Sequence, residues 1–234
     1  MTAVAPALLP SFLPAAFPRL CEPLEEVSAE TPADAAAALA FALDRLVGEK
    51  DAAAARPVVL VTTPLWLRER GRPFARGMAL WGCDLERLVW VKAERDAEAL
   101  WALEEALKSG VVAGGLATVE TPAFVTTRRL DFAARAGRAS AVLVRADGAA
   151  GDLSAARRRW RVMARPSTAA AFDAAAPGPA GFRATLVRRR DGPPGAWDLE
   201  QDDATGRLRV ASGLADHGVD EAGQPGCGRA SRAA

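Results

Sequence analysis

The stretch Pro57-Val58-Val59-Leu60-Val61-Thr62 decides the fold class, because it is a continuous apolar run rich in β-branched residues. A run of this kind is typical of a β-strand that is covered on both faces. We therefore expect a sheet with helices above and below it. Predicted strands alternate with predicted helices of roughly 10–15 residues along most of the chain, which indicates βαβ units and a mainly parallel sheet.

Capping residues and apolar spacing place the elements around this run. Thr31 and Asp34 form a capping-box pattern with Pro32 in the first turn, which predicts a helix over residues 31–47. Further helices are predicted at 74–81, 96–108 and 124–136, and further strands at 88–91, 111–119 and 140–145. Gly114 and Gly115 fall inside a predicted strand, where we expect close packing or a bulge.

The pattern changes after Gly151. Residues 159–164 alternate polar and apolar side chains, which predicts a strand with one exposed face. Three further short strands are predicted at 182–190, 196–201 and 207–210, separated by turn residues. We therefore expect a C-terminal antiparallel meander that extends one edge of the parallel sheet.

The 234-residue chain suits a single core. We predict a flexible N-terminal segment at 1–26, an α/β domain at 27–211 and a disordered tail at 212–234. The apolar N-terminal run lacks the basic start of a signal peptide and is interrupted by prolines. No segment approaches the roughly 20 apolar residues of a membrane span, so the sequence predicts a soluble, cytoplasmic protein without membrane contact.

Composition argues against several kinds of chemistry. His217 is the only histidine and lies in the predicted tail, so a histidine-based catalytic site is not expected. Cys21, Cys83 and Cys227 are far apart, which argues against a disulfide framework or a structural zinc site. The segment 28–34 contains two carboxylates and neither glycine nor lysine, so it does not look like a phosphate-binding loop. We predict no catalytic, cofactor-binding or metal-binding residues, and a protein that is not an enzyme.

Charge is divided unevenly along the chain. Residues 1–156 carry 17 basic and 20 acidic side chains, while residues 157–234 carry 13 basic and 9 acidic. Two arginine clusters on predicted strands are candidate partner-binding sites, because arginine recognises phosphates and carboxylates in a fixed geometry. The candidate residues are Arg157, Arg158, Arg159, Arg161, Arg188, Arg189 and Arg190.

A protein partner is favoured over nucleic acid for these clusters, because lysine is absent from both and the net charge of the chain is only +1. Strand alternation predicts that Trp160 and Val162 are buried while Arg159 and Arg161 remain free for a partner. The alternative is that the arginines only protect edge strands against self-association.

Several segments, taken in order and spacing, resemble the ImuA family. They are Leu100-Trp101-Ala102-Leu103-Glu104-Glu105-Ala106-Leu107, Arg128-Arg129-Leu130-Asp131-Phe132-Ala133-Ala134, Leu143-Val144-Arg145, Ser154-Ala155-Ala156-Arg157-Arg158-Arg159-Trp160-Arg161-Val162, and Leu186-Val187-Arg188-Arg189-Arg190-Asp191-Gly192 followed by Trp197. The resemblance spans residues 27–210. It implies a RecA-like, SulA-like α/β fold with a three-layer core, here without the phosphate-binding loop of RecA.

The resemblance also implies an accessory role in SOS-inducible, error-prone translesion DNA synthesis and DNA damage tolerance in bacteria. The implied partners are an ImuB-type Y-family-like polymerase homologue and an error-prone DNA polymerase III α subunit, with RecA as a further candidate and with weak or indirect DNA contact. We therefore expect a non-catalytic adaptor. The alternatives are a SulA-like regulator or inhibitor that acts by protein contact, and an active ATPase with an unusual loop.

Overall fold

A computed structural model describes residues 17–18, 22–47, 56–145, 153–167, 169–170, 173–190 and 192–211. The strands are β1 (Leu24–Ala29), β2 (Val58–Thr62), β3 (Leu88–Lys92), β4 (Gly114–Val119), β5 (Ser140–Arg145), β6 (Arg158–Arg165), β7 (Ala169–Ala170), β8 (Asp173–Pro177), β9 (Gly181–Arg189), β10 (Gly195–Gln201) and β11 (Leu208–Val210). The helices are α1 (Ala35–Val47), α2 (Pro64–Arg70), α3 (Ala75–Leu80), α4 (Asp96–Lys108) and α5 (Phe124–Gly137), with 3-10 turns at Pro32–Asp34 and Leu85–Arg87.

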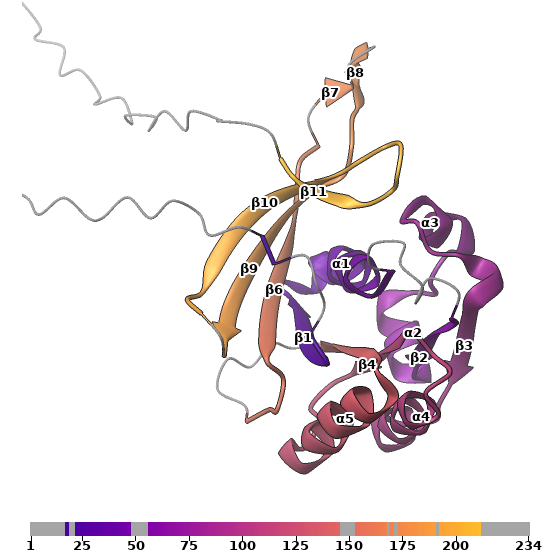
Figure 1. The fold of residues 1–234 in the computed structure, drawn as a ribbon. Coiled ribbons are helices and arrows are strands. Elements are labelled where there is room, and N and C mark those ends of the chain that lie inside the picture. The colour runs from indigo at the N-terminus through magenta and orange to yellow at the C-terminus, as the bar shows by residue number, and fades with distance from the viewer. Residues whose placement is uncertain are drawn as a thin grey trace, which may run out of the picture.

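Nine strands form one sheet in the order β11-β10-β9-β6-β1-β5-β4-β2-β3. The six strands from β6 to β3 pair in parallel. The strands β9, β10 and β11 add to β6 in antiparallel fashion (Figure 1). The expected α/β fold, a mainly parallel sheet extended by antiparallel C-terminal strands, is therefore confirmed. A separate two-stranded hairpin of β7 and β8 was not predicted.

Helices cover the two faces of the parallel strands. On one face, α1 packs through residues such as Phe41 against Leu60 and Trp160. On the other face, α4 and α5 pack through Leu103 and Leu130. In the antiparallel part, alternate residues of β9 and β10 join the α1 core. Their neighbours along each strand are half-exposed or exposed, so the described residues form a packed core on only one face there.

The position of β1 differs from the sequence expectation. β1 begins at Leu24, inside the stretch assigned to a flexible N-terminal segment at 1–26, and it lies between β5 and β6 in the middle of the sheet. The carboxylates of Glu25 and Glu26 conceal this strand in the sequence, because buried strands rarely carry adjacent charges. Apart from residues 17–18 and 22–26, the expected N-terminal segment lies outside the described residues, as does the expected tail at 212–234.

The helix α2 was also not predicted. It begins after Thr63, whose hydroxyl oxygen accepts a hydrogen bond from the amide of Trp66 at 3.3 Å. This cap and the proline at the first helical position fix its start. Trp66 is buried against the α1 side of the sheet, so a two-turn helix provides one large core residue.

The pair Gly114 and Gly115 is required for close packing, as expected. A Cβ atom at Gly114 would lie 2.6 Å from the carbonyl oxygen of Ser140 and 3.0 Å from Leu46 Cδ2 of α1. A Cβ atom at Gly115 would overlap Leu103 Cδ1 of α4. Helices therefore approach β4 closely from both faces at the same point.

We predict that Gly137→Ala destabilises the domain. Gly137 is the last residue of α5, and an added Cβ would overlap the backbone carbonyl of Leu107 in α4, which cannot move aside without shifting that helix. Overpacking of this kind typically costs about 1–3 kcal/mol of unfolding free energy. The measurement is urea denaturation of the full chain.

The matched control is Gly77→Ala in α3. There the nearest atom to an added Cβ is Phe74 Cδ1, at an ordinary 3.6 Å. This change should be neutral or stabilising by up to about 1 kcal/mol, because alanine favours the helix. Equal stability of both variants would contradict the close contact between α4 and α5.

Candidate interaction site

The two arginine clusters lie side by side at one end of β6 and β9. The register pairs Arg158 with Arg189 and Arg159 with Arg188. The amide of Arg190 also donates to the carbonyl oxygen of Arg157 at 3.1 Å. Clusters that are separated in the sequence are thus brought together by antiparallel pairing.

The middle of this cluster is buried, contrary to expectation. Arg158 is 5% exposed, and its guanidinium lies 2.8 Å from Glu22 and 3.3 Å from Glu25. Arg159 is 6% exposed, and its Nε lies 3.0 Å from a carboxylate oxygen of Glu26. The prediction that Arg159 remains free for a partner is therefore wrong, because β1 places a buried carboxylate against it.

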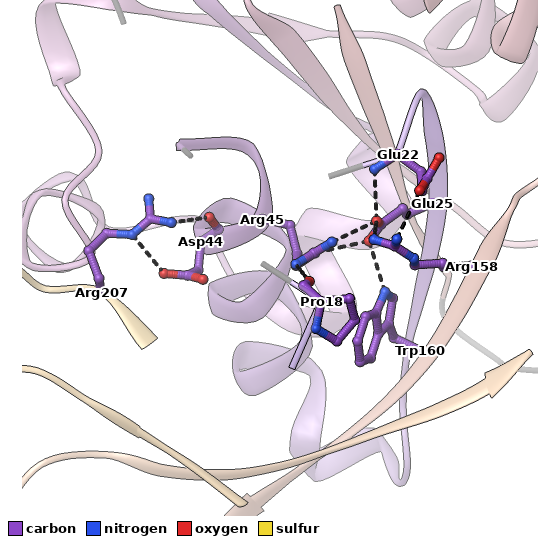
Figure 2. Close-up of polar contacts among 8 residues, drawn as sticks. All are labelled: Pro18, Glu22, Glu25, Asp44, Arg45, Arg158, Trp160 and Arg207. Atoms are coloured by element: carbon purple, nitrogen blue, oxygen red, sulfur yellow. Dashed lines mark hydrogen bonds and ion pairs between the residues drawn. The ribbon is translucent and has the colours of Figure 1, made fainter. Parts of the chain in front are cut away.

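Glu25 is the centre of the polar network on the α1 side of the sheet (Figure 2). Its side chain is fully buried and accepts hydrogen bonds from Arg45 Nη2 at 2.7 Å and Arg45 Nε at 3.0 Å. The indole Nε1 of Trp160 donates to it at 2.8 Å, and Arg158 Nη1 donates at 3.3 Å. Arg45 also donates to the carbonyl oxygen of Pro18. Glu22 supplies a second carboxylate, so the two arginines and the two glutamates balance in charge.

Glu26 makes a similar arrangement on the opposite face of β1. Its carboxylate lies 3.0 Å from Arg159 and 3.6 Å from Arg145 of β5, and the hydroxyl of Ser154 donates to it. Successive residues of a strand point to opposite faces. Two adjacent carboxylates are therefore buried on opposite sides of the sheet, and each is neutralised by arginines from other elements.

Trp160 and Val162 are buried, as the alternation predicted. The Trp160 ring lies 5.1 Å from Phe41 and 5.8 Å from Trp197, measured between ring centroids. Phe17 contacts all three rings, at 5.6 to 6.5 Å. This N-terminal contact could not be predicted, because the sequence around Phe17 shows only proline-interrupted apolar residues.

A further ion pair joins α1 to the last strand. Asp44 Oδ1 accepts from the amide of Leu208 at 2.9 Å and lies 3.1 Å from Arg207 Nε. Arg207 also donates to the carbonyl oxygen of Asp44 at 2.8 Å (Figure 2). These contacts hold the start of β11 against the C-terminal half of α1.

The remaining candidate arginines are more accessible. Arg188 and Arg190 are exposed, while Arg157, Arg161 and Arg189 are half-buried. Arg161 lies 3.6 Å from Glu30 at the end of β1. The accessible part of the predicted site is therefore centred on the end of β9.

The carboxylate of Asp34, in the loop between β1 and α1, accepts hydrogen bonds from that loop and from β6. Asp34 accepts from the Thr31 amide at 3.0 Å, the Thr31 hydroxyl at 2.6 Å and the Ala164 amide at 2.9 Å. Burial alone would raise the pKa of Asp34, but these hydrogen bonds outweigh it and hold the pKa below its ordinary value. The predicted capping box is confirmed. An ionised carboxylate lies where a phosphate-binding loop would present free amides.

Other sequence predictions concern metal binding, membrane contact and cysteine chemistry. Among the described residues, no group of three or more His, Cys, Asp or Glu side chains is placed to bind a metal ion. In the same part of the chain, no helix has the length and apolar character needed to cross a membrane. Burial raises the pKa of the Cys83 thiol, and the nearby Asp84 carboxylate raises it further. A raised pKa disfavours the reactive thiolate. Cys21, Cys227 and His217 lie outside the described residues.

Comparison with known proteins gives two similar curated sequences, both called Protein ImuA, from two strains of Caulobacter vibrioides. Each is 36% identical to this chain over 167 residues, which cover 66% of this chain and 68% of the relative. The chain belongs to the ImuA family. No protein-family model matches the sequence. The crystal structure of SulA from Pseudomonas aeruginosa is 24% identical, with a TM-score of 0.40 over 53% of this chain and 98% of that chain.

Membership of the ImuA family confirms the resemblance noted in the sequence. In this ImuA-family chain, the quoted segment 154–162 contributes Ser154, Arg158, Arg159 and Trp160 to the two buried networks around β1. Sequence reasoning missed their partners Glu25, Glu26 and Arg45. The available signal was a pair of charge doublets of opposite sign, Glu25-Glu26 and Arg158-Arg159, each of which is followed by a run that continues as a strand.

We predict that Glu25→Ala is strongly destabilising in this ImuA-family protein. The change leaves the buried guanidinium of Arg45 and the indole N–H of Trp160 without their carboxylate. Removal of one partner of a buried ion pair typically costs about 3–5 kcal/mol. The control is Glu105→Ala, which removes an exposed ion pair with Lys108 and should change stability little. Chemical denaturation that gave the same result for both variants would contradict a stabilising role of this network.

We also predict that the purified chain shows no saturable ATP binding at micromolar concentrations. The reason is that the Thr31 and Ala164 amides already bind the Asp34 carboxylate, which would also repel a phosphate. Calorimetric titration of the full chain with ATP and Mg²⁺ measures this. Saturable binding that is lost on changing residues 28–34 would contradict the prediction.

Proposed function

We propose that this chain is a non-catalytic adaptor in SOS-inducible, error-prone translesion DNA synthesis. Membership of the ImuA family supports a role in damage-inducible mutagenesis and suggests an accessory protein. The observation that carries the adaptor proposal is the β1–α1 loop, where Asp34 occupies the amides that a nucleotide phosphate would need. A fold without that phosphate site acts through its surfaces.

The end of β9 is the surface that we assign to a protein partner. The register of β6 and β9 shifts between Arg159 and Trp160, so Val187 has no cross-strand partner in this pairing. Irregularities of this kind re-aim side chains at a strand end. Val187 is 41% exposed, and Arg188 and Arg190 are exposed beside it. Arginine is enriched at protein interfaces, and Val187 adds exposed apolar surface next to Arg188.

The proposed partners are an ImuB-type Y-family-like polymerase homologue and an error-prone DNA polymerase III α subunit, with RecA as a further candidate. A carboxylate-rich surface on the partner would complement Arg188 and Arg190. DNA contact would be weak or indirect, because the net charge of the chain is +1 and strong phosphate binding requires many cations.

We predict that the double substitution Arg188→Ala, Arg190→Ala weakens binding to the ImuB-type partner at least tenfold. Because both side chains are exposed, the free energy of unfolding should change by no more than about 0.5 kcal/mol. The matched control is Arg128→Ala, Arg138→Ala, which removes two exposed arginines, one in α5 and one at its C-cap, and leaves the end of β9 unchanged. Interferometry with the purified partner and a denaturation curve for each variant provide the measurement.

Equal binding by the parent and the Arg188/Arg190 variant would place the interface elsewhere. Affinity capture of the tagged full chain from DNA-damaged cells then tests the adaptor role itself. Polymerase-type partners would support it, whereas capture of a filament-forming protein alone would favour the SulA-like regulator.

A further inference from the structure

A groove of about 260 Å³ lies between the N-terminal half of α1 and the connection from α2 to α3. Its floor is apolar and is formed by side chains from three helices. These include Leu39 and Leu43 of α1, Trp66 of α2 and Met78 of α3. All four belong to the core on the α1 side of the sheet, so the floor is part of that packed core.

The rim of the groove is cationic. Arg70 and Arg72 both line it. Arg70 donates to the carbonyl oxygen of Pro32 at 3.1 Å, while Arg72 is exposed and has no ion-pair partner among the described residues. Residues 64–92 hold six basic and three acidic side chains, although the first 156 residues together have an acidic excess. The segment that contributes the rim is therefore basic within a part of the chain that is acidic as a whole.

Two features leave the groove open to a large ligand. Phe74, at the start of α3, lines the groove with 71% of its surface exposed. Gly77 presents no side chain, and an added Cβ there would meet only Phe74 atoms at 3.6 Å or more. An exposed aromatic ring beside an apolar floor is typical of a surface that binds another protein.

We infer that this groove binds an acidic peptide segment of a protein partner. Large apolar side chains of the segment would cover the floor and the Phe74 ring, and its carboxylates would pair with Arg72 and approach Arg70. An amphipathic segment laid into an apolar groove is a common mode of peptide recognition. The charge of the rim selects an acidic segment. This inference rests on the proposed adaptor function and adds a contact surface distinct from Arg188 and Arg190.

The probe is a displayed library of random 14-residue peptides, selected on the immobilised full chain. Enriched peptides are synthesised with a fluorescent label, and their affinities are measured by anisotropy. The test variants are Arg72→Glu, which reverses the charge of the rim, and Gly77→Leu, which fills the open space with a helix-favouring side chain. The matched controls are Arg128→Glu, an exposed position of α5, and Ala79→Leu, an exposed position of α3 that does not line the groove.

We expect enriched peptides that combine an excess of Asp and Glu with large apolar residues. Their binding should weaken at least tenfold with Arg72→Glu and with Gly77→Leu, and should be unchanged by both controls. Failure to enrich peptides, enrichment without acidic residues, or equal binding to Gly77→Leu would overturn the inference. Displacement of the peptide by ATP, with ATP binding itself lost in Gly77→Leu, would also overturn it by identifying a nucleotide as the occupant.

The outcome can be separated from that of the proposed function. If no groove peptide binds but the full chain still captures polymerase-type partners from damaged cells, the groove assignment fails and the adaptor role stands. If peptides bind as expected but no such partners are captured, the groove is correct and its partner belongs to another process.

Discussion

Burial of two adjacent carboxylates on β1 is the constraint on which the rest of the structure depends. β1 lies between β5 and β6 in the parallel part of the sheet, next to the strand on which the antiparallel part begins, and Glu25 and Glu26 point to its opposite faces. Each needs arginines from other elements: Arg45 and Arg158 on one face, Arg145 and Arg159 on the other. A shift of one residue in register would exchange the two faces and leave buried charges unpaired. The ionic contacts therefore specify which strands flank β1 and in which register.

This constraint also changes the interpretation of the arginine clusters. In the sequence, the basic C-terminal part looks like one surface for a partner. In the structure, Arg158 and Arg159 form buried ion pairs with the carboxylates of β1. Only the ends of the two clusters therefore remain accessible. The carboxylate of Asp34 in the β1–α1 loop is likewise used within the fold, because it accepts hydrogen bonds from backbone amides of the same chain. Charged groups that would suggest ligand binding when only the sequence is considered instead hold β6 against β1 and against the β1–α1 loop.

Sequence reasoning succeeded where an element is specified by its own residues. The apolar run of β2, the helix α4 and the strand β5 carry their periodicity and caps locally, and their predicted bounds agree closely with the structure. β1 could not be predicted in this way, because its burial depends on arginines of other elements, three of which lie more than a hundred residues away. The prediction that Arg159 is exposed was wrong for a related reason. Alternation distinguishes the two faces of a strand, but it does not tell which faces are covered.

β6 shows how this coverage decides the role of each residue. Its first half lies beside β1, where both faces are covered, and Arg158, Arg159 and Trp160 are all buried. Its second half carries Met163, which is 36% exposed, because there the described residues form a core on only one face. Side chains of similar chemical type are therefore buried in the first half of this strand and accessible in the second. The register with β9 shifts between Arg159 and Trp160, within the covered half of β6, and the shift leaves Val187 without a cross-strand partner. The end of β9 therefore lies beside the covered half of β6 but on the side away from β1, where β9 continues into the exposed residues Arg188 and Arg190 that we assign to a partner.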